Sequence, residues 1–278
     1  MSLYAELFQH LMFVNPVNKE IPKRYKMSQR GTSCANLYEA SVRNDGRVFA
    51  FTLAEVLITL VIIGVVAALT IPNLMQKYTE QTTVKKVQKF YSNLSNAYSL
   101  ALKNNGTVKE WGITGYNTES AEKIYQTLFK PYFKIAKNCG TTNTGNCITN
   151  GWEKYRDNNP AHQPGSSKSY YKISLEDGMT VYFRARTEAR ANIYVYFDTN
   201  GAKNPNTWGE DLFLIFILND KVFPSGNQSG AYSKYPFVPY CTNKQYGYGC
   251  TAWVVYKGNM DYLHCDGLTW NSRSCKDK

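Results

Sequence analysis

Cysteine is the residue type with the clearest chemistry in this chain. The seven cysteines lie at positions 34, 139, 147, 241, 250, 265 and 275, and no two of them form a CxxC pair. Only three histidines (His10, His162 and His264) could join them as ligands, so the set does not favour a structural zinc site. A cut between residues 34 and 139 would leave an even set of six, as expected of disulfides in an oxidising compartment. Among the many pairings allowed, the short spacings suggest Cys139–Cys147, Cys241–Cys250 and Cys265–Cys275.

No catalytic motif accompanies the cysteines. The chain contains no GxSxG, no HExxH and no phosphate-binding glycine loop. His264 adjoins Cys265, but neighbours in sequence rarely face each other as a base and a nucleophile do. We therefore predict a protein that is not an enzyme, with no catalytic residues, no metal and no cofactor.

Glu55 is the second distinctive residue, because it lies in the longest apolar stretch. Phe51–Ile71 is 21 residues long, and Glu55 is its only ionisable residue. As a helix, this stretch would reach about 30 Å, the thickness of the hydrocarbon core of a bilayer. A carboxylate at depth costs about 2.5–3.5 kcal/mol and normally has a partner. No Lys or Arg lies within the stretch, so a positive group of another molecule would serve. Hydropathy alone leaves a buried soluble helix and an ordinary signal anchor as alternatives.

The start of this stretch resembles a known motif. The cleavage and methylation motif of type IV pilins and type II secretion pseudopilins is similar to residues 51–60, FTLAEVLITL. The resemblance implies that a prepilin peptidase cuts between Ala50, where the family usually has Gly, and Phe51, whose new amine is then methylated. It also implies that Glu55 pairs with the N-terminal amine of a neighbouring subunit during assembly, and that Pro72 kinks the helix.

The same resemblance implies an order of segments and a set of partners. Residues 1–50 would be a cytoplasmic leader that is removed, starting at Met1 or Met27, and residues 51–71 would span the cytoplasmic membrane once. The remainder would lie outside the cytoplasm, in the periplasm or at the cell surface. The implied partners are the prepilin peptidase, other pilin or pseudopilin subunits, the inner-membrane assembly platform and membrane lipid.

A helical pattern continues beyond the apolar stretch, over residues 72–105. Asn104-Asn105-Gly106 is a typical end of a helix. We favour packing of the apolar face of this helix on the protein's own sheet over packing on a second helix in a coiled coil. The apolar residues of this face, a stripe spaced three and four apart, are Val84, Val87, Tyr91, Leu94, Tyr98 and Ala101.

The remainder, residues 106–278, is predicted to form strands and turns. Glu176-Asp177-Gly178 would close a hairpin, and the segments before residue 169 and around 224–250 are predicted loops. Residues 252–263 are similar to the tail of the pseudopilin group and would finish the core as a strand and turn. The predicted strands are Ser169–Leu175, Thr180–Phe183, Ala191–Asp198, Asp211–Leu218 and Thr251–Tyr256.

The loop between two of these strands, residues 198–211, has two interpretations. It is similar to a segment of type II secretion-type proteins. The resemblance implies that Asp198, Asn200 and Asp211 of this chain would bind calcium. The loop lacks EF-hand spacing, and Lys203 would oppose a cation. Asx turns that close the loop are the favoured alternative.

The sequence therefore predicts an α+β, pilin-like fold, in which a long N-terminal helix packs on a small antiparallel sheet. The net charge of +11 is spread along the chain without a basic run, so nucleic-acid binding is not favoured. The expected function is that of a type II secretion-type pseudopilin or minor pilin in an envelope-spanning filament that supports protein secretion. The alternative is a type IV pilus tip or minor subunit for adhesion or DNA uptake.

Overall fold

The computed structural model describes residues 52–149, 153–161, 163–186, 192–204, 206–218, 221–227, 235–243 and 246–276. The predicted leader, with Met27 and Cys34, lies outside the described residues. The same is true of Ala50 and Phe51.

One long helix, α2 (Leu53–Asn105), opens the described chain and runs for 53 residues. It ends at the predicted Asn104-Asn105-Gly106 stop, where Gly106 adopts φ +73° and its N–H donates to the carbonyl of Leu102 at 3.0 Å. A left-handed residue at this point is favourable for glycine because it has no Cβ. The predicted end of the helix is confirmed.

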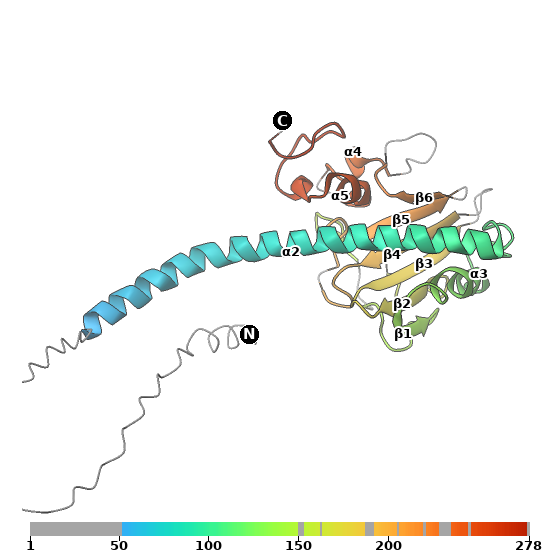
Figure 1. The fold of residues 1–278 in the computed structure, drawn as a ribbon, viewed down its shortest axis with the longest axis horizontal. Coiled ribbons are helices and arrows are strands. Elements are labelled where there is room, and N and C mark those ends of the chain that lie inside the picture. The colour runs from blue at the N-terminus through green and yellow to red at the C-terminus, as the bar shows by residue number, and fades with distance from the viewer. Residues whose placement is uncertain are drawn as a thin grey trace, which may run out of the picture. The chain divides into compact units, whose positions relative to one another are not determined.

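A six-stranded antiparallel sheet follows, in which each strand pairs with the next strand along the chain. Leu175 and Thr180 bound the predicted hairpin, and Gly178 takes φ +83° in its turn. The α+β fold, a long helix on an antiparallel sheet, is therefore confirmed (Figure 1). The strands are β1 (Ile135–Gly140), β2 (Tyr171–Leu175), β3 (Thr180–Arg186), β4 (Asn192–Asp198), β5 (Leu212–Leu218) and β6 (Lys221–Pro224).

The C-terminal half of α2 lies across one face of this sheet (Figure 1). Phe90 is fully buried, and its ring centroid lies 4.4 Å from that of Phe197 on β4. The predicted stripe therefore packs on the protein's own sheet, as favoured above. All six of its members belong to the core on this face, five buried and Tyr91 half-buried. Burying such a stripe stabilises the pair of layers by removing apolar area from water.

The opposite face of the sheet carries a second core that is rich in tyrosine. Tyr182 and Tyr196 are cross-strand neighbours whose rings stack with centroids 5.0 Å apart. Side chains from outside the strands also pack on this face, among them Tyr155, Ala161, Tyr235 and Tyr248. The buried members are Ile148, Tyr170, Tyr182, Tyr194, Tyr196, Trp208, Leu212, Leu214, Phe216 and Leu218.

The prediction of a strand at Thr251–Tyr256 is wrong, because this segment is the helix α5 (Thr251–Lys257). Gly258 ends the helix in a left-handed conformation, with φ 72°. Trp253 and Val254 are fully buried on the core beside β5 and β6. Packing therefore overrides the β propensity of the Val-Val-Tyr run.

The predicted loops before residue 169 and around 224–250 also contain regular elements. Asn117 caps α3 (Thr118–Ile124) by accepting a hydrogen bond from Ser120 N at 2.8 Å, and this capping residue was a usable sequence signal. A π-helical turn (Tyr125–Phe129) follows α3 directly. The other elements that the predictions missed among the described residues are β1, β6, the short α4 (Phe237–Tyr240) and a 3-10 turn (Asp261–Leu263).

Candidate functional site

The N-terminal part of α2 lies outside both cores and is strongly apolar. By length and composition, α2 is the one helix among the described residues that could cross a membrane. A core helix of a soluble protein can pass the same test, but it would be mostly buried, whereas the apolar stretch here is not. An exposed surface of this kind marks a contact with lipid or protein. The exposed large apolar side chains in the N-terminal part of α2 are Leu53, Val56, Leu57, Ile58, Leu60, Val61, Ile62, Ile63, Val65, Val66, Leu69, Ile71, Leu74, Met75 and Tyr78.

Threonine hydroxyls on this stretch are satisfied within the helix. Thr59 Oγ1 donates to the carbonyl of Val56, and Thr70 Oγ1 donates to that of Val66, each at 2.9 Å. Such bonds suit a helix in lipid, where water cannot satisfy a hydroxyl. The stretch is therefore compatible with an apolar surrounding along its length.

Pro72 lies inside α2, which continues through it without a break. Proline has no N–H for the carbonyl four residues earlier, so it weakens the helix at this point. Figure 1 shows α2 curving over its N-terminal half. A sharp kink at Pro72 itself stays a prediction.

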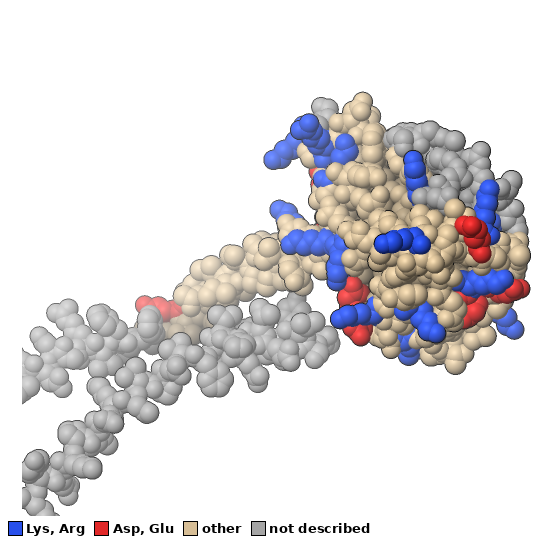
Figure 2. Space-filling view, turned by 45° about the vertical axis from the view of Figure 1, so that its right-hand side comes forward, with Lys and Arg blue, Asp and Glu red and all other residues tan. Residues whose placement is uncertain are grey.

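Glu55 lies in the first turn of α2 and is exposed. Figure 2 shows acidic atoms near the N-terminal end of this otherwise apolar part of the helix. A carboxylate in the first turn interacts favourably with the helix dipole. The cleavage and methylation site at Ala50 and Phe51 lies outside the described residues and stays a prediction.

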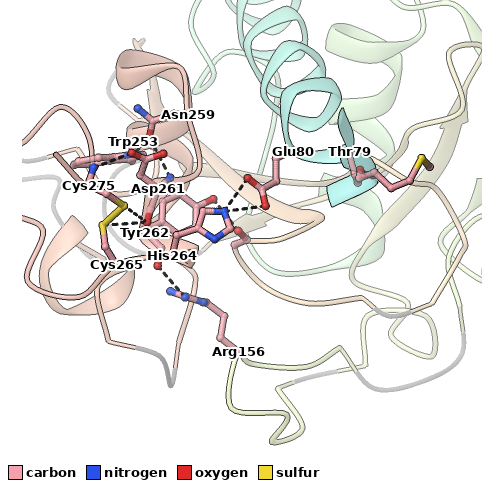
Figure 3. A network of polar contacts seen from close by, with 12 residues as sticks. Thr79, Glu80, Arg156, Trp253, Asn259, Asp261, Tyr262, His264, Cys265 and Cys275 are labelled. Atoms are coloured by element: carbon pink, nitrogen blue, oxygen red, sulfur yellow. Dashed lines mark hydrogen bonds and ion pairs between the residues drawn. A yellow bond between two sulfur atoms is a disulfide. The ribbon is translucent and has the colours of Figure 1, made fainter. Parts of the chain in front are cut away.

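A polar network ties α2 to the C-terminal segment where the helix passes from its exposed part to its packed part. His264 Nε2 lies 2.9 Å from both carboxylate oxygens of Glu80 on α2, and the two side chains face each other in Figure 3. Arg156 donates to the carbonyl of Tyr262 at 3.0 Å and to that of Cys241 at 2.7 Å. These contacts hold the C-terminal segment against the helix and the neighbouring loop, and sequence spacing gave no sign of them.

Three disulfides join the cysteines in the pairs that their spacing suggests. Cys139 bonds to Cys147, Cys241 to Cys250 and Cys265 to Cys275. Each closes a short loop next to the core, which stabilises the fold by about 2–4 kcal/mol. Because Cys265 is bonded, it does not form a nucleophile pair with His264.

The loop at 198–211 buries two carboxyl groups and closes by Asx turns. Asn200 N donates to Asp198 Oδ1 at 2.9 Å, the favoured Asx arrangement, and Asn200 Nδ2 donates to Asp211 Oδ2 at 2.8 Å. Burial and the nearby Asp211 raise the pKa of Asp198 to about 9, and burial raises the pKa of Asp211 to about 7. Within the described ranges, no three His, Cys, Asp or Glu residues converge to hold a metal ion.

These pKa shifts predict that the protein loses stability as the pH rises. Between about pH 4 and pH 9 the unfolded chain releases protons that folded Asp198 retains, so the free energy of unfolding falls through this window. Asp198→Asn replaces the carboxyl group by an amide that does not titrate, so the variant does not lose this part of its stability as the pH rises. We therefore expect the free energy of unfolding of the variant to exceed that of the wild type at pH 8 by more than about 1 kcal/mol. The two should converge near pH 4. Urea unfolding at several pH values, with exposed Asp157→Asn as control, measures this difference. Parallel profiles of the wild type and Asp198→Asn would contradict it.

Comparison with known proteins places the globular part of the chain in one family. A family described as a family of unknown function (DUF6613) matches residues 73–252. The match covers the packed half of α2 and the whole sheet, and it begins after the apolar stretch. No curated protein and no solved structure matches the chain.

Proposed function

The chain belongs to this family of unknown function (DUF6613), and we propose that it is a type II secretion-type pseudopilin or minor pilin. In this proposal the prepilin peptidase removes residues 1–50, and the new N-terminal amine is methylated. The exposed part of α2 then anchors the chain once in the cytoplasmic membrane, with the disulfide-bonded domain outside the cytoplasm. Subunits leave the membrane through an assembly platform to form a filament that supports protein secretion. The protein is thus a substrate of the peptidase and a structural subunit, not an enzyme.

One observation carries the proposal: an exposed apolar helix bears a carboxylate in its first turn and continues without a break into the domain. Glu55 and the apolar side chains around it are exposed, whereas the later part of the same helix is buried on the sheet. A membrane anchor alone would explain the apolar surface, but it gives no reason for an acid there, since a charge in lipid is costly. A filament supplies a reason, because the amine of a neighbouring subunit would pair with the acid.

The disulfides support the proposed location of the domain. Structural disulfides form and persist in oxidising compartments and are rare in the cytosol of most cells. The six described cysteines are all bonded, in three pairs. A domain outside the cytoplasm would be in the compartment that these bonds require.

A filament-tip role in adhesion or DNA uptake is the second candidate, and it would be favoured by a broad exposed aromatic patch away from α2. Outside α2, the clearly exposed large aromatic side chains among the described residues are Tyr116 and Tyr256, at 42% and 52%. Most other tyrosines of the sheet face are buried in the second core. We therefore rank assembly above surface adhesion.

Mass spectrometry of the mature N-terminus tests the proposal. We expect the protein purified from its membrane to begin at Phe51 and to carry one methyl group on the amine. The same protein from cells without the prepilin peptidase should retain residues before 51. A mature chain that begins after Ala67 or Ala68 would show processing as an ordinary secretory signal and would contradict the proposal.

A further inference from the structure

The second face of the sheet holds a small pocket whose walls come from distant parts of the chain. In β3, β4 and β5 the side chains alternate, so that Arg184, Tyr196 and Leu214 all lie on the face opposite α2. Strand register sets Tyr196 beside Leu214. The pocket has a volume of about 260 Å³ and is lined by Tyr170, Arg184, Tyr196, Leu214, Tyr235 and Tyr248.

The size and walls of this pocket suit one small ring. Its volume lies just below the range of roughly 300–1,000 Å³ that is usual for small-molecule sites, so a single sugar ring fits better than a chain of several. Tyr170, Tyr196 and Leu214 are almost fully buried and form a preformed floor. Tyr235 and Tyr248 are half-buried and stand closer to solvent. Phenol rings offer apolar faces for the C–H groups of a sugar and hydroxyls for its polar edge.

Arg184 gives the pocket a positive charge, and no carboxylate among the described residues forms an ion pair with it; the buried acid nearest the tyrosine floor, Glu153, accepts a hydrogen bond from Tyr182 instead. Its guanidinium carbon lies 4.7 Å from the ring centre of Tyr116 and 4.9 Å from that of Tyr170. Hydrogen bonds link it to Tyr116 and Tyr196. In the described part of the chain it makes no ion pair, and its Nε is buried without a hydrogen-bond partner.

A half-buried arginine is normally paired with an acid, because removing a charge from water is costly. Here tyrosine rings and hydroxyls hold the guanidinium instead, at the wall of an open pocket. Arginine presents a planar fork of donors that matches the two oxygens of a carboxylate. The missing acid would therefore be supplied by a ligand.

We propose that this pocket binds a pyranose-sized ligand bearing a carboxylate, of the uronic acid class. The carboxylate pairs with Arg184, the ring lies on the tyrosine floor, and the ring hydroxyls reach the phenol hydroxyls of Tyr235 and Tyr248. The inference does not depend on the proposed filament, because it uses only the sheet face of the domain.

Titration of the full chain in detergent micelles tests this binding. Glucuronate should bind saturably by calorimetry, and it should bind at least about tenfold more tightly than glucose, which lacks the carboxylate, or acetate, which lacks the ring. Arg184→Gln should weaken glucuronate binding by at least about tenfold, with no comparable change for glucose. Arg186→Gln is the matched control, because it removes the same charge two residues further along β3 and does not line the pocket.

The comparison of glucuronate with glucose and acetate on the wild-type chain needs no variant, so it tests the proposal even if a variant fails to fold. No saturable binding of glucuronate, or equal binding of glucuronate and glucose, would overturn the proposal. Equal losses in Arg184→Gln and Arg186→Gln would also overturn it, because they would show a general charge effect. Arg184→Lys, which keeps the charge and loses the fork, should bind glucuronate more weakly than the wild type does. Unchanged binding by this variant would count against the pairing.

Discussion

A chain with Glu55→Gln is expected to enter the membrane and to be processed at Phe51, but to be almost absent from filaments. Glutamine keeps the shape of the side chain and removes the charge that would pair with the amine of a neighbouring subunit. Loss of one partner from an ion pair in an apolar surrounding costs about 3–5 kcal/mol. Incorporation should therefore fall by roughly a hundredfold or more. Quantitative immunoblots of sheared filament and membrane fractions from the same cells measure the ratio.

Thr59→Val is the matched control for this experiment. Thr59 lies one helical turn after Glu55 in the same apolar stretch, and its hydroxyl bonds to its own helix at the carbonyl of Val56. Valine has nearly the same shape, so this variant should assemble normally. Normal incorporation of Glu55→Gln would remove the reason for assigning Glu55 a role in assembly. A loss in both variants would point to a general effect on the apolar surface.

Phe90→Ala is expected to lower the free energy of unfolding of the domain by about 3–5 kcal/mol. Phe90 is fully buried at the centre of the contact between α2 and the sheet, between the rings of Phe133 and Phe197. Alanine would leave a cavity between the two layers, which the rigid sheet cannot close. Urea unfolding of the full chain in detergent, followed by tryptophan fluorescence, measures the loss.

Leu100→Ala provides the comparison on the same helix. Leu100 is 47% exposed, so its truncation should cost less than about 1 kcal/mol. Equal losses in the two variants would contradict the assignment of Phe90 to the contact between the layers. A small loss in both would mean that the sheet is stable without the helix.

Local patterns in the sequence determined the elements whose signals span only a few residues. The apolar stretch, the stripe on residues 84–101 and the Asn-Asn-Gly stop depend on helical spacing and on glycine geometry, which are local properties. The hairpin at Glu176-Asp177-Gly178 follows from turn chemistry in the same way. The cysteine pairs could be inferred because the two cysteines of each pair lie only 8 to 10 positions apart, where few alternative partners are near.

Tertiary packing alone decided the secondary structure of segments whose sequence has a weak or misleading preference for helix or strand. Residues 251–257 have strand-like composition, yet they form α5 because Trp253 must reach the core from that position. The edge strand β1 gave no apolar alternation, since three of its six residues are exposed, and its pairing with β2 places it.

The pocket around Arg184 lay beyond the reach of the sequence for a different reason. Its lining residues span positions 170 to 248 and meet only when the register of β3, β4 and β5 is fixed. Register depends on pairing between strands, and a shift of one residue would turn Arg184 to the other face of the sheet. Periodicity within a segment thus determined the long helix, whereas contacts between distant segments decided where side chains of different strands come together.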